Sequence, residues 1–563
     1  MRTGGQLVVE GLKRWGVDVV FGLPGVQLDW FFDALAEDGT VRVVHTRHEQ
    51  AAAYMADGYA RATGRVGVCA VVPGPGVLNA GAALSTAYAC NSPVLCLVGQ
   101  VPGRDLGLGR GALHEIPDQL AVLRGTIGWA EHAARPEQVP ALVDAAFTRL
   151  CRPGRRRPAA IELPWDVLMA TSDATYPPRP TLPGAKAPSP AVVDEAARRL
   201  LAARRPMIWA GGGTMDAGAE VLALADALDA PVVVTTQAKG AVSDRHPRVL
   251  PSVAATTLLP HADAVVVVGT RFFTASGEPR LAEGTVVVRI DVDPEELGRA
   301  AVAACDIEAD AGLACTALAA AIMAARGSGH PSGAAVSSDI AALRDTIAVR
   351  LAERFEELAA YCSAVRAALP DDGILVDEMT QVGYFARNGF PCYTPRTYIG
   401  SGYQGTLGFG YATALGAKVG QPDRAVVSLS GDGGFLYNMA ELATAVQHRI
   451  GVAVVVFDDG AYGNVKRIQS RQFGREIASS LINPDFVALA RSFGARAYRA
   501  DGPDALAESL ADALRDGGPA LVHVRLGPQP EIWDILTGRE TLVAYDPAEA
   551  SWARAKAPIP STR

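Results

Sequence analysis

Short apolar runs alternate with segments of helical length along most of the chain. Towards the C-terminal end, residues 425–430 (AVVSLS) and 452–457 (VAVVVF) are valine-rich runs, and residues 439–448 between them can form a helix. This order predicts a strand, helix, strand unit with parallel strands. A right-handed crossover brings the carboxyl ends of both strands to the same edge of the sheet.

The same alternation recurs in the rest of the chain. Near the N-terminus we expect strands at 41–44 and 66–72, with a helix over 51–61. Farther along, the predicted strands are apolar runs at residues 207–210, 232–235, 264–269 and 286–290. The pattern predicts the α/β fold class, with three doubly wound parallel-sheet domains.

Two breaks interrupt this pattern. Residues 171–190 hold six prolines in twenty residues and predict an extended linker, and residues 326–333 (RGSGHPSG) predict a second one. The expected organisation is a first domain at 1–170, a linker at 171–190, a central domain at 191–326, a linker at 327–350, a third domain at 351–545 and a C-terminal tail at 546–563.

Carboxylates follow both strands of the first unit described. Asp432 lies in Gly431-Asp432-Gly433 after the strand at 425–430, and Asp459 lies in Asp458-Asp459-Gly460 after the strand at 452–457. Because the two strand ends share an edge, these side chains can share one ion, and carboxylates together with a diphosphate suit Mg²⁺. Two solvated acidic turns would have the same sequence, so this motif alone leaves both interpretations open.

A second candidate site is predicted in the N-terminal domain. Glu49 lies at a turn between a strand and a helix, and Pro73-Gly74-Pro75-Gly76 forms a tight turn of little bulk after the strand at 66–72. Such a loop allows a ligand to approach the backbone closely. A lone glutamate at a helix start is more often a favourable partner of the helix dipole than a catalyst, so Glu49 by itself is a weak signal.

Composition narrows the functional class. The chain has 563 residues, 49% of them hydrophobic, and a net charge of -8, which disfavours a nucleic-acid partner. Its eight cysteines include no Cys-x-x-Cys pair and are expected to be free thiols in a reducing compartment. We find no apolar segment long enough for a bilayer and no signal peptide, and we expect a cytoplasmic protein without a membrane partner.

Short motifs follow one another in a fixed order over nearly the whole chain. They are FGLPG (21–25), TRHEQAAAYMADGYAR (46–61), PGPG (73–76), IELPWDV (161–167), WAGGGT (209–214), RIDVDPEELGR (289–299), GTLGFG (405–410), GDGGFLYN (431–438) and DDGAYGN (458–464). The ordered set resembles the thiamine-diphosphate-dependent family of acetolactate synthase, pyruvate oxidase and benzaldehyde lyase. The resemblance implies that the first domain binds the pyrimidine of thiamine diphosphate and the third its diphosphate.

The resemblance also implies roles for individual residues. Glu49 would hydrogen-bond the pyrimidine ring, and Asp432, Asp459 and the backbone oxygen of Ala461 would hold Mg²⁺. The backbone carbonyl of Gly405 would accept a hydrogen bond from the 4′-amino group, and Leu407 would hold the cofactor bent. The remaining predicted cofactor contacts are Pro73, Gly74, Gly76, Thr380, Gln381, Gly431, Gly433, Gly434, Tyr462, Gly463 and Asn464. In this family Glu49 serves the site of the other subunit, which implies a homo-oligomer with shared active sites, either a dimer or a dimer of dimers.

Several positions depart from the family pattern around the substrate. The chain has Asp458-Asp459 for an Asn-Asn pair, Gly25-Val26-Gln27 for Gly-Gly-Ala, Leu113-His114 for Phe-Gln and Ile468 for a specificity tryptophan. Gln27 and His114 are therefore candidate catalytic residues beside Glu49. Gln27 either orients a substrate carbonyl or carboxylate or is a structural amide, and His114 either exchanges protons or is an ordinary loop histidine. Lys466 and Arg467 are expected to face solvent or phosphate.

The predicted function is that of an acetolactate synthase-like carboligase. It would decarboxylate a 2-oxo acid, by default pyruvate, and join the resulting enamine to an aldehyde or ketone. The alternatives are a simple 2-oxo-acid decarboxylase or a flavin-linked oxidase and, from another class, a noncatalytic cofactor-binding scaffold or regulatory subunit. Arg271 is shared with flavin-binding synthases but the residues after it diverge, which leaves FAD open.

Overall fold

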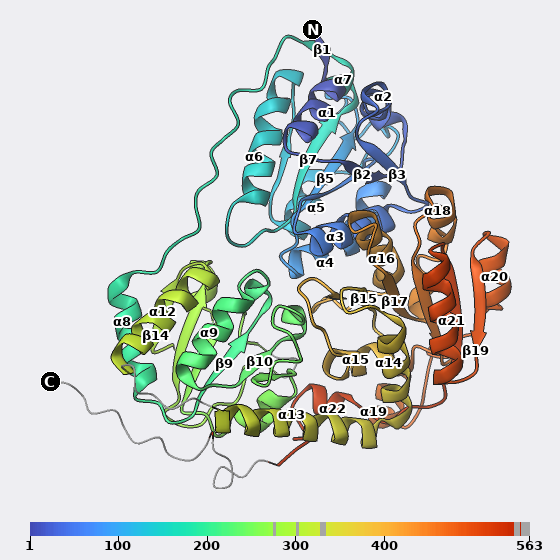
Figure 1. Ribbon diagram of the computed structural model, residues 1–563. Coiled ribbons are helices and arrows are strands. Elements are labelled where there is room, and N and C mark those ends of the chain that lie inside the picture. Colours follow the sequence, from blue (N-terminus) through green and yellow to red (C-terminus); the bar gives the residue numbers. More distant parts are fainter. Residues whose placement is uncertain (274–276, 300–302, 327–333, 545–551, 553–563) are drawn as a thin grey trace.

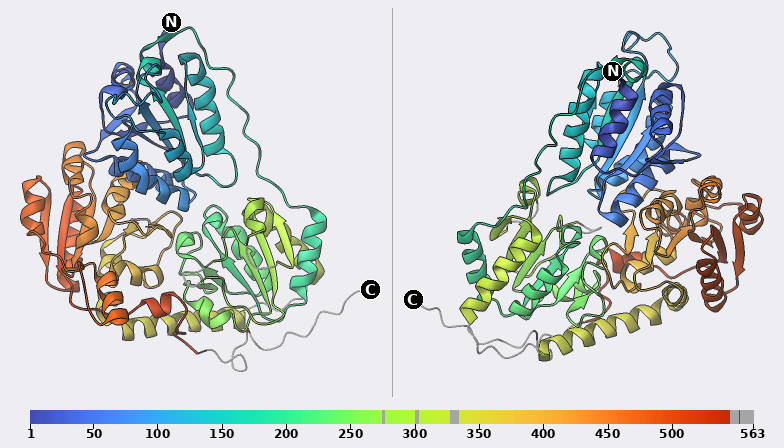
Figure 2. Two further views of the ribbon diagram at one scale, coloured as in Figure 1. Left: turned by 180° about the vertical axis from the view of Figure 1, so that it is seen from behind. Right: turned by 45° about the horizontal axis from the view of Figure 1, so that its top comes forward.

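Each set of valine-rich runs forms one parallel sheet. The computed structural model describes residues 1–273, 277–299, 303–326, 334–544 and 552. They build three domains, each around a six-stranded sheet, which in Figure 1 lie at the top (N-terminal), lower left (central) and lower right (C-terminal). Figure 2 shows the same triangular arrangement from two further directions. The predicted fold class of three doubly wound α/β domains is confirmed.

The N-terminal sheet has the strand order β3-β2-β4-β5-β7-β6, with all neighbours parallel. Its strands are β2 (Val19–Gly22), β3 (Arg42–His45), β4 (Gly67–Val71), β5 (Val94–Gln100), β6 (Ala130–His132) and β7 (Ala159–Pro164). Its helices are α1 (Gly4–Arg14), α2 (Asp29–Asp38), α3 (Glu49–Thr63), α4 (Pro75–Ala89), α5 (Gln119–Ile127), α6 (Val139–Cys151) and α7 (Trp165–Met169). A short antiparallel pair, β1 (Arg2–Thr3) with β8 (Thr171–Ser172), joins the ends of this domain.

The central sheet has the order β11-β10-β9-β12-β13-β14, again all parallel. Its strands are β9 (Pro206–Ala210), β10 (Val232–Val234), β11 (Val249–Leu250), β12 (Ala264–Val268), β13 (Val286–Asp291) and β14 (Cys305–Glu308). Its helices are α8 (Pro190–Leu201), α9 (Gly218–Leu228), α10 (Ala254–Leu258), α11 (Pro294–Leu297) and α12 (Ala311–Arg326).

The C-terminal sheet has the order β16-β15-β17-β18-β20-β19 and is parallel throughout. Its strands are β15 (Ile374–Asp377), β16 (Tyr398–Gly400), β17 (Val426–Gly431), β18 (Ala453–Asp458), β19 (Arg496–Ala500) and β20 (Ala520–Arg525). Its helices are α14 (Glu356–Ala368), α15 (Gln381–Gly389), α16 (Phe409–Gly420), α17 (Asp432–Phe435), α18 (Glu441–His448), α19 (Gly463–Phe473), α20 (Phe486–Ser492), α21 (Pro503–Asp516) and α22 (Trp533–Leu536).

Helix α3 of the N-terminal domain packs directly on helix α16 of the C-terminal domain. Two glycines make the close approach possible: a Cβ on Gly58 would lie 2.0 Å from the Thr413 carbonyl oxygen, and one on Gly416 would lie 1.9 Å from the Met55 carbonyl oxygen. Buried side chains of both helices, including Tyr54 and Phe409, belong to one hydrophobic cluster. The two outer domains are therefore one packed unit within the chain.

The segments between the domains differ in structure. Residues 173–189 contain no helix or strand and run down the outside of the molecule from β8 to α8 (Figure 1). Of the predicted second linker, residues 327–333 lie outside the described residues, and residues 334–350 form most of helix α13 (Ala334–Arg354). Val336, Ile340 and Ile347 are buried at helical spacing, and this apolar face stabilises the helix. Apart from Trp552, the predicted tail at 546–563 is also outside the described residues.

All eight cysteines are free, and five of them are buried, as expected from their apolar surroundings. Among the described residues, no helix combines the length and the apolar character that a bilayer crossing requires.

Candidate active site

The carboxyl edge of the C-terminal sheet carries most of the predicted cofactor residues. Thr380 and Gln381 follow β15, Gly405 and Leu407 follow β16, the GDGG segment follows β17, and Tyr462, Gly463 and Asn464 follow β18. Chain connections lead from β15 to its neighbour β16 on one side and from β17 to β18 on the other. This divergence makes the β15–β17 junction the switch point of the sheet, where such folds bind ligands.

Asp432 and Asp459 lie together at this edge, as their spacing predicts. Strands β17 and β18 are parallel neighbours with Gly431 opposite Phe457, so Asp432 and Asp459 follow adjacent strand ends. The Asn483 side-chain amide donates to Asp432 Oδ2 (2.6 Å) and to Asp458 Oδ1 (2.8 Å), and thereby connects the two loops.

The three aspartates differ in their electrostatic environment. Burial, together with the negative charge of Asp432, raises the pKa of Asp459 to about 6. Burial also raises the pKa of Asp432. Burial acts in the same direction on Asp458, but hydrogen bonds from His523 and Asn483 outweigh it and lower its pKa. Asp432 and Asp459 are thus a crowded pair that a cation would stabilise, whereas Asp458 already has a partner in His523 at 3.0 Å.

The surrounding groups fit a small cation that also binds phosphate. Within the described residues, no three His, Cys, Asp or Glu side chains converge as a metal site. A cation held by Asp432 and Asp459 therefore needs further oxygen ligands, such as the Ala461 carbonyl and a diphosphate. A Cβ at Gly463 would lie 2.3 Å from Asp459 Oδ2, so a larger residue there would displace the Asp459 carboxylate.

The second predicted constellation assembles at the carboxyl edge of the N-terminal sheet. Glu49 begins helix α3, is 8% exposed, and accepts a hydrogen bond from Asn79 Nδ2 at 2.9 Å. Gly76 in the PGPG loop is its neighbour: a Cβ there would lie 3.6 Å from Glu49 Oε1. Gly74 adopts φ +56°, and a Cβ on it would lie 2.3 Å from the His114 carbonyl oxygen. Glu49 therefore lies next to the loop after Pro73 at Gly76, and His114 lies next to it at Gly74.

Gln27 and His114 are brought to the same place. Gln27 Nε2 donates to the Leu113 carbonyl at 3.0 Å, and Gln27 Cβ lies close to Gly99 at the end of β5. Gln27 Oε1 and His114 Nδ1 are both buried without a hydrogen-bond partner among the described residues. Two unsatisfied buried polar atoms near the PGPG loop are what a pocket for a polar substrate would present.

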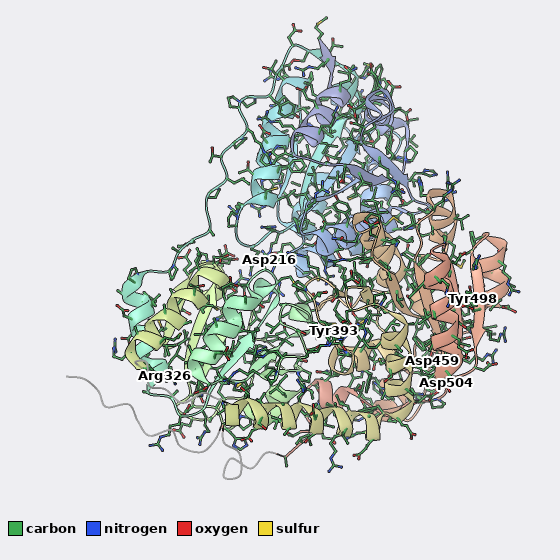
Figure 3. All side chains as sticks on the ribbon, viewed as in Figure 1. Asp216, Arg326, Tyr393, Asp459, Tyr498 and Asp504 are labelled. Carbon is green, nitrogen blue, oxygen red and sulfur yellow. The ribbon has the colours of Figure 1, made fainter. Side chains whose placement is uncertain are left out.

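The start of helix α3 is tied to the C-terminal domain by residues on either side of Glu49. Glu441 accepts hydrogen bonds from the backbone N–H groups of Arg47 and His48, and Asn438 donates to Gln50. Glu49 itself turns towards Asn79, within its own domain. Figure 3 labels Asp459 in the C-terminal domain, so within one chain the two constellations belong to different domains.

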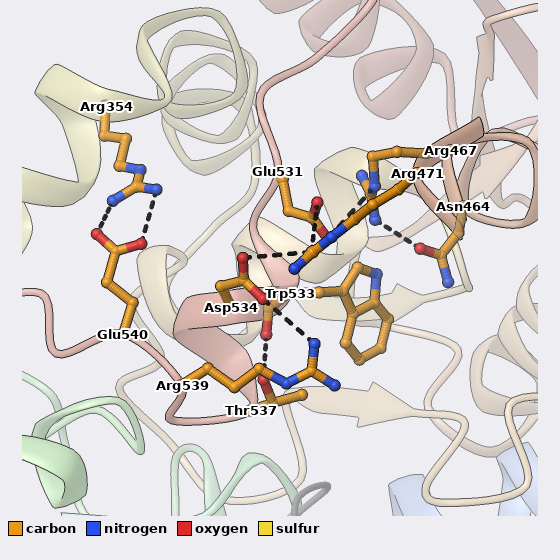
Figure 4. Close-up of polar contacts among 10 residues, drawn as sticks. All are labelled: Arg354, Asn464, Arg467, Arg471, Glu531, Trp533, Asp534, Thr537, Arg539 and Glu540. Atoms are coloured by element: carbon orange, nitrogen blue, oxygen red, sulfur yellow. Dashed lines mark hydrogen bonds and ion pairs between the residues drawn. The ribbon is translucent and has the colours of Figure 1, made fainter. Parts of the chain in front are cut away.

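Helix α19 begins directly after the loop that carries the predicted metal ligands Asp459 and Ala461, and it has no buried residue. Arg467 donates to Asn464 Oδ1 at 2.6 Å and lies 3.6 Å from Glu531, and Arg471 contacts Glu531 (3.2 Å) and Asp534 (3.4 Å). Figure 4 shows these acids on the C-terminal segment that carries α22. Lys466, in contrast, pairs with Glu476 and is partly exposed. Arg467 therefore contacts a predicted cofactor residue, and its position depends on the C-terminal segment.

Sequence reasoning missed several polar groups that complete the site. Asn79 contacts Glu49 from one turn into α4. Glu378 is 1% exposed, accepts from the Gly408 N–H at 2.6 Å, and has its pKa raised to about 7 by burial. Its position directly after the strand ILVD is the same signal that singled out Asp432. The contacts of Asn483 and His523 carry no comparable sequence signal.

Comparison with known proteins identifies the family. Three family models match the chain: the N-terminal binding domain of thiamine pyrophosphate enzymes at residues 2–122, the central domain at 193–318 and the C-terminal binding domain at 378–524. The chain belongs to the thiamine pyrophosphate enzyme family. Its N-terminal and C-terminal domains are therefore the thiamine-diphosphate-binding domains of this enzyme family.

Relatives named for two different activities match nearly the whole chain. The chain is 33% identical to a probable acetolactate synthase large subunit of Methanocaldococcus jannaschii, over 93% of this chain and 92% of the relative. It is 35% identical to a probable 2-ketoarginine decarboxylase of Pseudomonas aeruginosa, over 93% and 94%. It is 29% identical to the acetolactate synthase isozyme 1 large subunit of Escherichia coli, over 95% and 96%.

A separate cavity of about 1680 Å³ opens among the three domains. Arg271, the residue shared with flavin-binding synthases, lies in its wall, donates to the Ala89 carbonyl at 2.8 Å and covers the Tyr403 ring at 4.9 Å. The neighbouring residues 274–276 lie outside the described residues.

Proposed function

We propose that this enzyme is an acetolactate synthase-like carboligase that decarboxylates a 2-oxo acid, by default pyruvate, and joins the remaining fragment to an aldehyde or ketone. The observation that carries the proposal is the pairing of a buried Glu49 with the glycine loop beside it, in a chain whose relatives include acetolactate synthase large subunits. When bound, thiamine diphosphate supplies a carbon nucleophile and an electron sink.

The residues around that cofactor would position it and move protons. Glu49 would share a proton with a ring nitrogen through Oε1, which faces the Gly76 loop while Asn79 bonds Oε2. Asp432, Asp459 and the Ala461 carbonyl would hold Mg²⁺ with the diphosphate, alongside the backbone of Gly431 to Gly434. Gln27 and His114, each with an unsatisfied buried atom, would contact the substrate.

We further propose a homodimer in which Glu49 of one subunit faces the diphosphate loops of the other. We call the Glu49 constellation of the N-terminal domain and the diphosphate loops of the C-terminal domain the two half-sites. Exposed apolar side chains surround both half-sites, and such clusters are unusual on the free surface of a monomer. They are Val26, Leu78 and Leu113 near Glu49, and Tyr437, Ile468, Ile477 and Ile482 near the diphosphate loops.

The eight free cysteines of the protein support a cytoplasmic location.

Simple decarboxylation is the second candidate, favoured by the similarity to a probable 2-ketoarginine decarboxylase. The deciding experiment measures carbon dioxide release and product mass from purified protein with thiamine diphosphate and Mg²⁺. Pyruvate, 2-ketoarginine and a panel of 2-oxo acids are tested as donors, each with and without aldehyde and 2-oxo-acid acceptors. A ligated product supports the carboligase, and a free aldehyde as the sole product replaces it with a decarboxylase.

The control is Glu49→Gln, which keeps the shape of the side chain but cannot exchange the proton. If that variant turns over at the wild-type rate, catalysis through this site is excluded. Absorbance in the flavin region of the purified protein tests the oxidase alternative in the same preparation.

A further inference from the structure

A chain of buried polar side chains runs beneath the loop next to Glu49. Gln119, at the start of α5, and Glu162, on β7, are each only 2% exposed. Gln119 Oε1 accepts the Gly74 N–H at 2.8 Å, and Gln119 Nε2 donates to the Gly99 carbonyl (3.1 Å) and to Glu162 Oε1 (2.8 Å). One amide thus connects the loop after β4 to the end of β5.

Glu162 is held from the other side as well. Gln100 Nε2 donates to Glu162 Oε1 at 2.8 Å, and His132 Nδ1 lies 2.6 Å from Glu162 Oε2. A buried carboxylate is costly unless it is fully hydrogen-bonded, and these three side chains provide the partners. His132 is also the most exposed of these hydrogen-bonded side chains, with 22% of its side chain exposed.

The chemistry of the neighbours fixes which way the Gln119 amide faces. An ionised carboxylate and a backbone carbonyl only accept hydrogen bonds, so the NH₂ group must face Glu162 and Gly99. The amide oxygen must then face the Gly74 N–H, which is the geometry observed. A flipped amide would set oxygen against oxygen twice and would leave Gly74 without an acceptor.

The position of Gly74 matters for the residues on both sides of it. Gly74 adopts φ +56° and ψ −108°, a conformation that L side chains rarely adopt, and α4 with Asn79 begins at the next residue. His114 packs against Gly74 and lies on the same connection as Gln119, five residues before it. Gly99, the other Gln119 partner, lies against Gln27. His114 and Gln27 therefore lie against backbone that Gln119 holds, and Glu49 lies beside Gly76, two residues after Gly74.

We propose that Gln119 is a positioning residue that sets the geometry of the Pro73–Gly76 loop beside Glu49, with Glu162 and His132 fixing the orientation of its amide. This inference rests on the proposed function of Glu49. Both polar atoms of the Gln119 side chain bond within the protein, to Gly74, Gly99 and Glu162, so Gln119 acts through the backbone of Gly74.

The test measures exchange of the thiazolium C2 proton into deuterium oxide by NMR, and thiamine diphosphate affinity by calorimetry with Mg²⁺. In Gln119→Leu, which has a similar volume but no hydrogen bonds, we expect exchange to slow by about ten- to a hundredfold, because small misplacements of catalytic groups have effects of this size. Cofactor binding should weaken by about tenfold or less. The matched control is Gln138→Leu, since Gln138 also accepts a backbone N–H, from Ala134, at another loop of the same domain. It should exchange at the wild-type rate.

A second variant covers the case in which Gln119→Leu does not fold. Glu162→Gln can donate to Gln119 and so permits the amide to flip, and we expect a loss of about threefold in exchange with a folded protein. Wild-type exchange rates in a folded Gln119→Leu protein or, failing that protein, in Glu162→Gln would overturn the proposal. Absence of exchange in the wild-type enzyme would instead remove the proposed function on which it rests.

Discussion

Asp458 differs from the two aspartates beside it because its charge is already matched within the protein. Its carboxylate bonds His523 and Asn483, whereas burial raises the pKa of both Asp432 and Asp459, and the charge of Asp432 adds to the rise at Asp459. At the level of single residues, the Asp458 carboxylate is therefore compatible with an anionic diphosphate nearby.

A first prediction separates these aspartates by substitution. Asp459→Ala removes a proposed oxygen ligand, and we expect the Mg²⁺ concentration for half-maximal cofactor binding to rise by about ten- to a hundredfold. Asp458→Asn keeps an acceptor for Asn483 and should change it by less than about threefold. Calorimetric titration of Mg²⁺ into enzyme with thiamine diphosphate measures both. A larger effect at Asp458 than at Asp459 would contradict the assigned ligands.

A second prediction concerns Glu378, whose pKa burial raises from 4.5 to about 7. The folded protein keeps this proton up to about pH 7, while the unfolded chain releases it near pH 4.5. Its stabilising contribution is therefore complete below pH 4.5 and is lost as the pH rises through 7, by about 3 kcal/mol at most. Glu378→Gln mimics the protonated form, so its Tm should fall less than that of the wild type between pH 5 and pH 8.

Scanning calorimetry of the cofactor-free proteins gives the two Tm values. Glu353→Gln, at an exposed glutamate on α13, should follow the wild type at both pH values. Equal falls in Tm for Glu378→Gln and the wild type would show that Glu378 is ionised throughout this range.

The predicted site residues whose positions follow from the sequence are those that come directly after strand ends. Asp432 and Asp459 had to share an edge once β17 and β18 were read as parallel neighbours. Asn79 and Gln119 reach Glu49 and Gly74 through contacts set by packing of α4, α5 and β7, and no local pattern encodes such contacts. Asn483 likewise acts across the 25 residues that separate it from Asp458.

At the scale of elements, α19 is the least buried part of the site. Its ion pairs with the rest of the protein include those of Arg467 and Arg471 with Glu531 and Asp534 of the C-terminal segment. That segment is anchored in turn by Trp533, whose ring packs on Tyr384 at 4.8 Å, and by the ion pair of Glu540 with Arg354 (Figure 4). The order of α19 therefore depends on residues far along the chain.

A third prediction tests this dependence. Partly exposed ion pairs are each worth about 1 kcal/mol or less, so Glu531→Ala should leave Tm nearly unchanged. Amide hydrogen exchange across residues 463–473 should nevertheless quicken by about two- to fivefold, because local opening of α19 loses two pairs at once. Mass spectrometry of peptides reports this exchange. Glu353→Ala, which breaks the exposed pair with Arg350 on α13, is the control and should leave α19 unaffected.

At the scale of the whole molecule, the sequence predicts the sheets better than their assembly. Valine-rich runs determine three parallel sheets, because strands buried on both faces must be apolar throughout. The packing of α3 on α16 depends on Gly58 and Gly416, and no local pattern shows which helix each of these glycines packs against. Residues 334–350 were predicted as part of a linker because a glycine-rich segment precedes them. They belong to helix α13, whose apolar positions recur at helical spacing.

The last prediction follows from the placement of the two half-sites in different domains. If sites form between subunits, a Glu49→Gln chain and an Asp432→Ala chain are each inactive, but their heterodimer contains one site with both defects and one with neither. Random mixing yields heterodimers as half of the population, so activity should return to about a quarter of the wild-type value. If Glu49 and Asp432 of one chain formed one site, every heterodimer site would carry a defect and no activity would return. Mixing unfolded variants, refolding them together and measuring carbon dioxide release distinguishes these outcomes, with each variant refolded alone as the control.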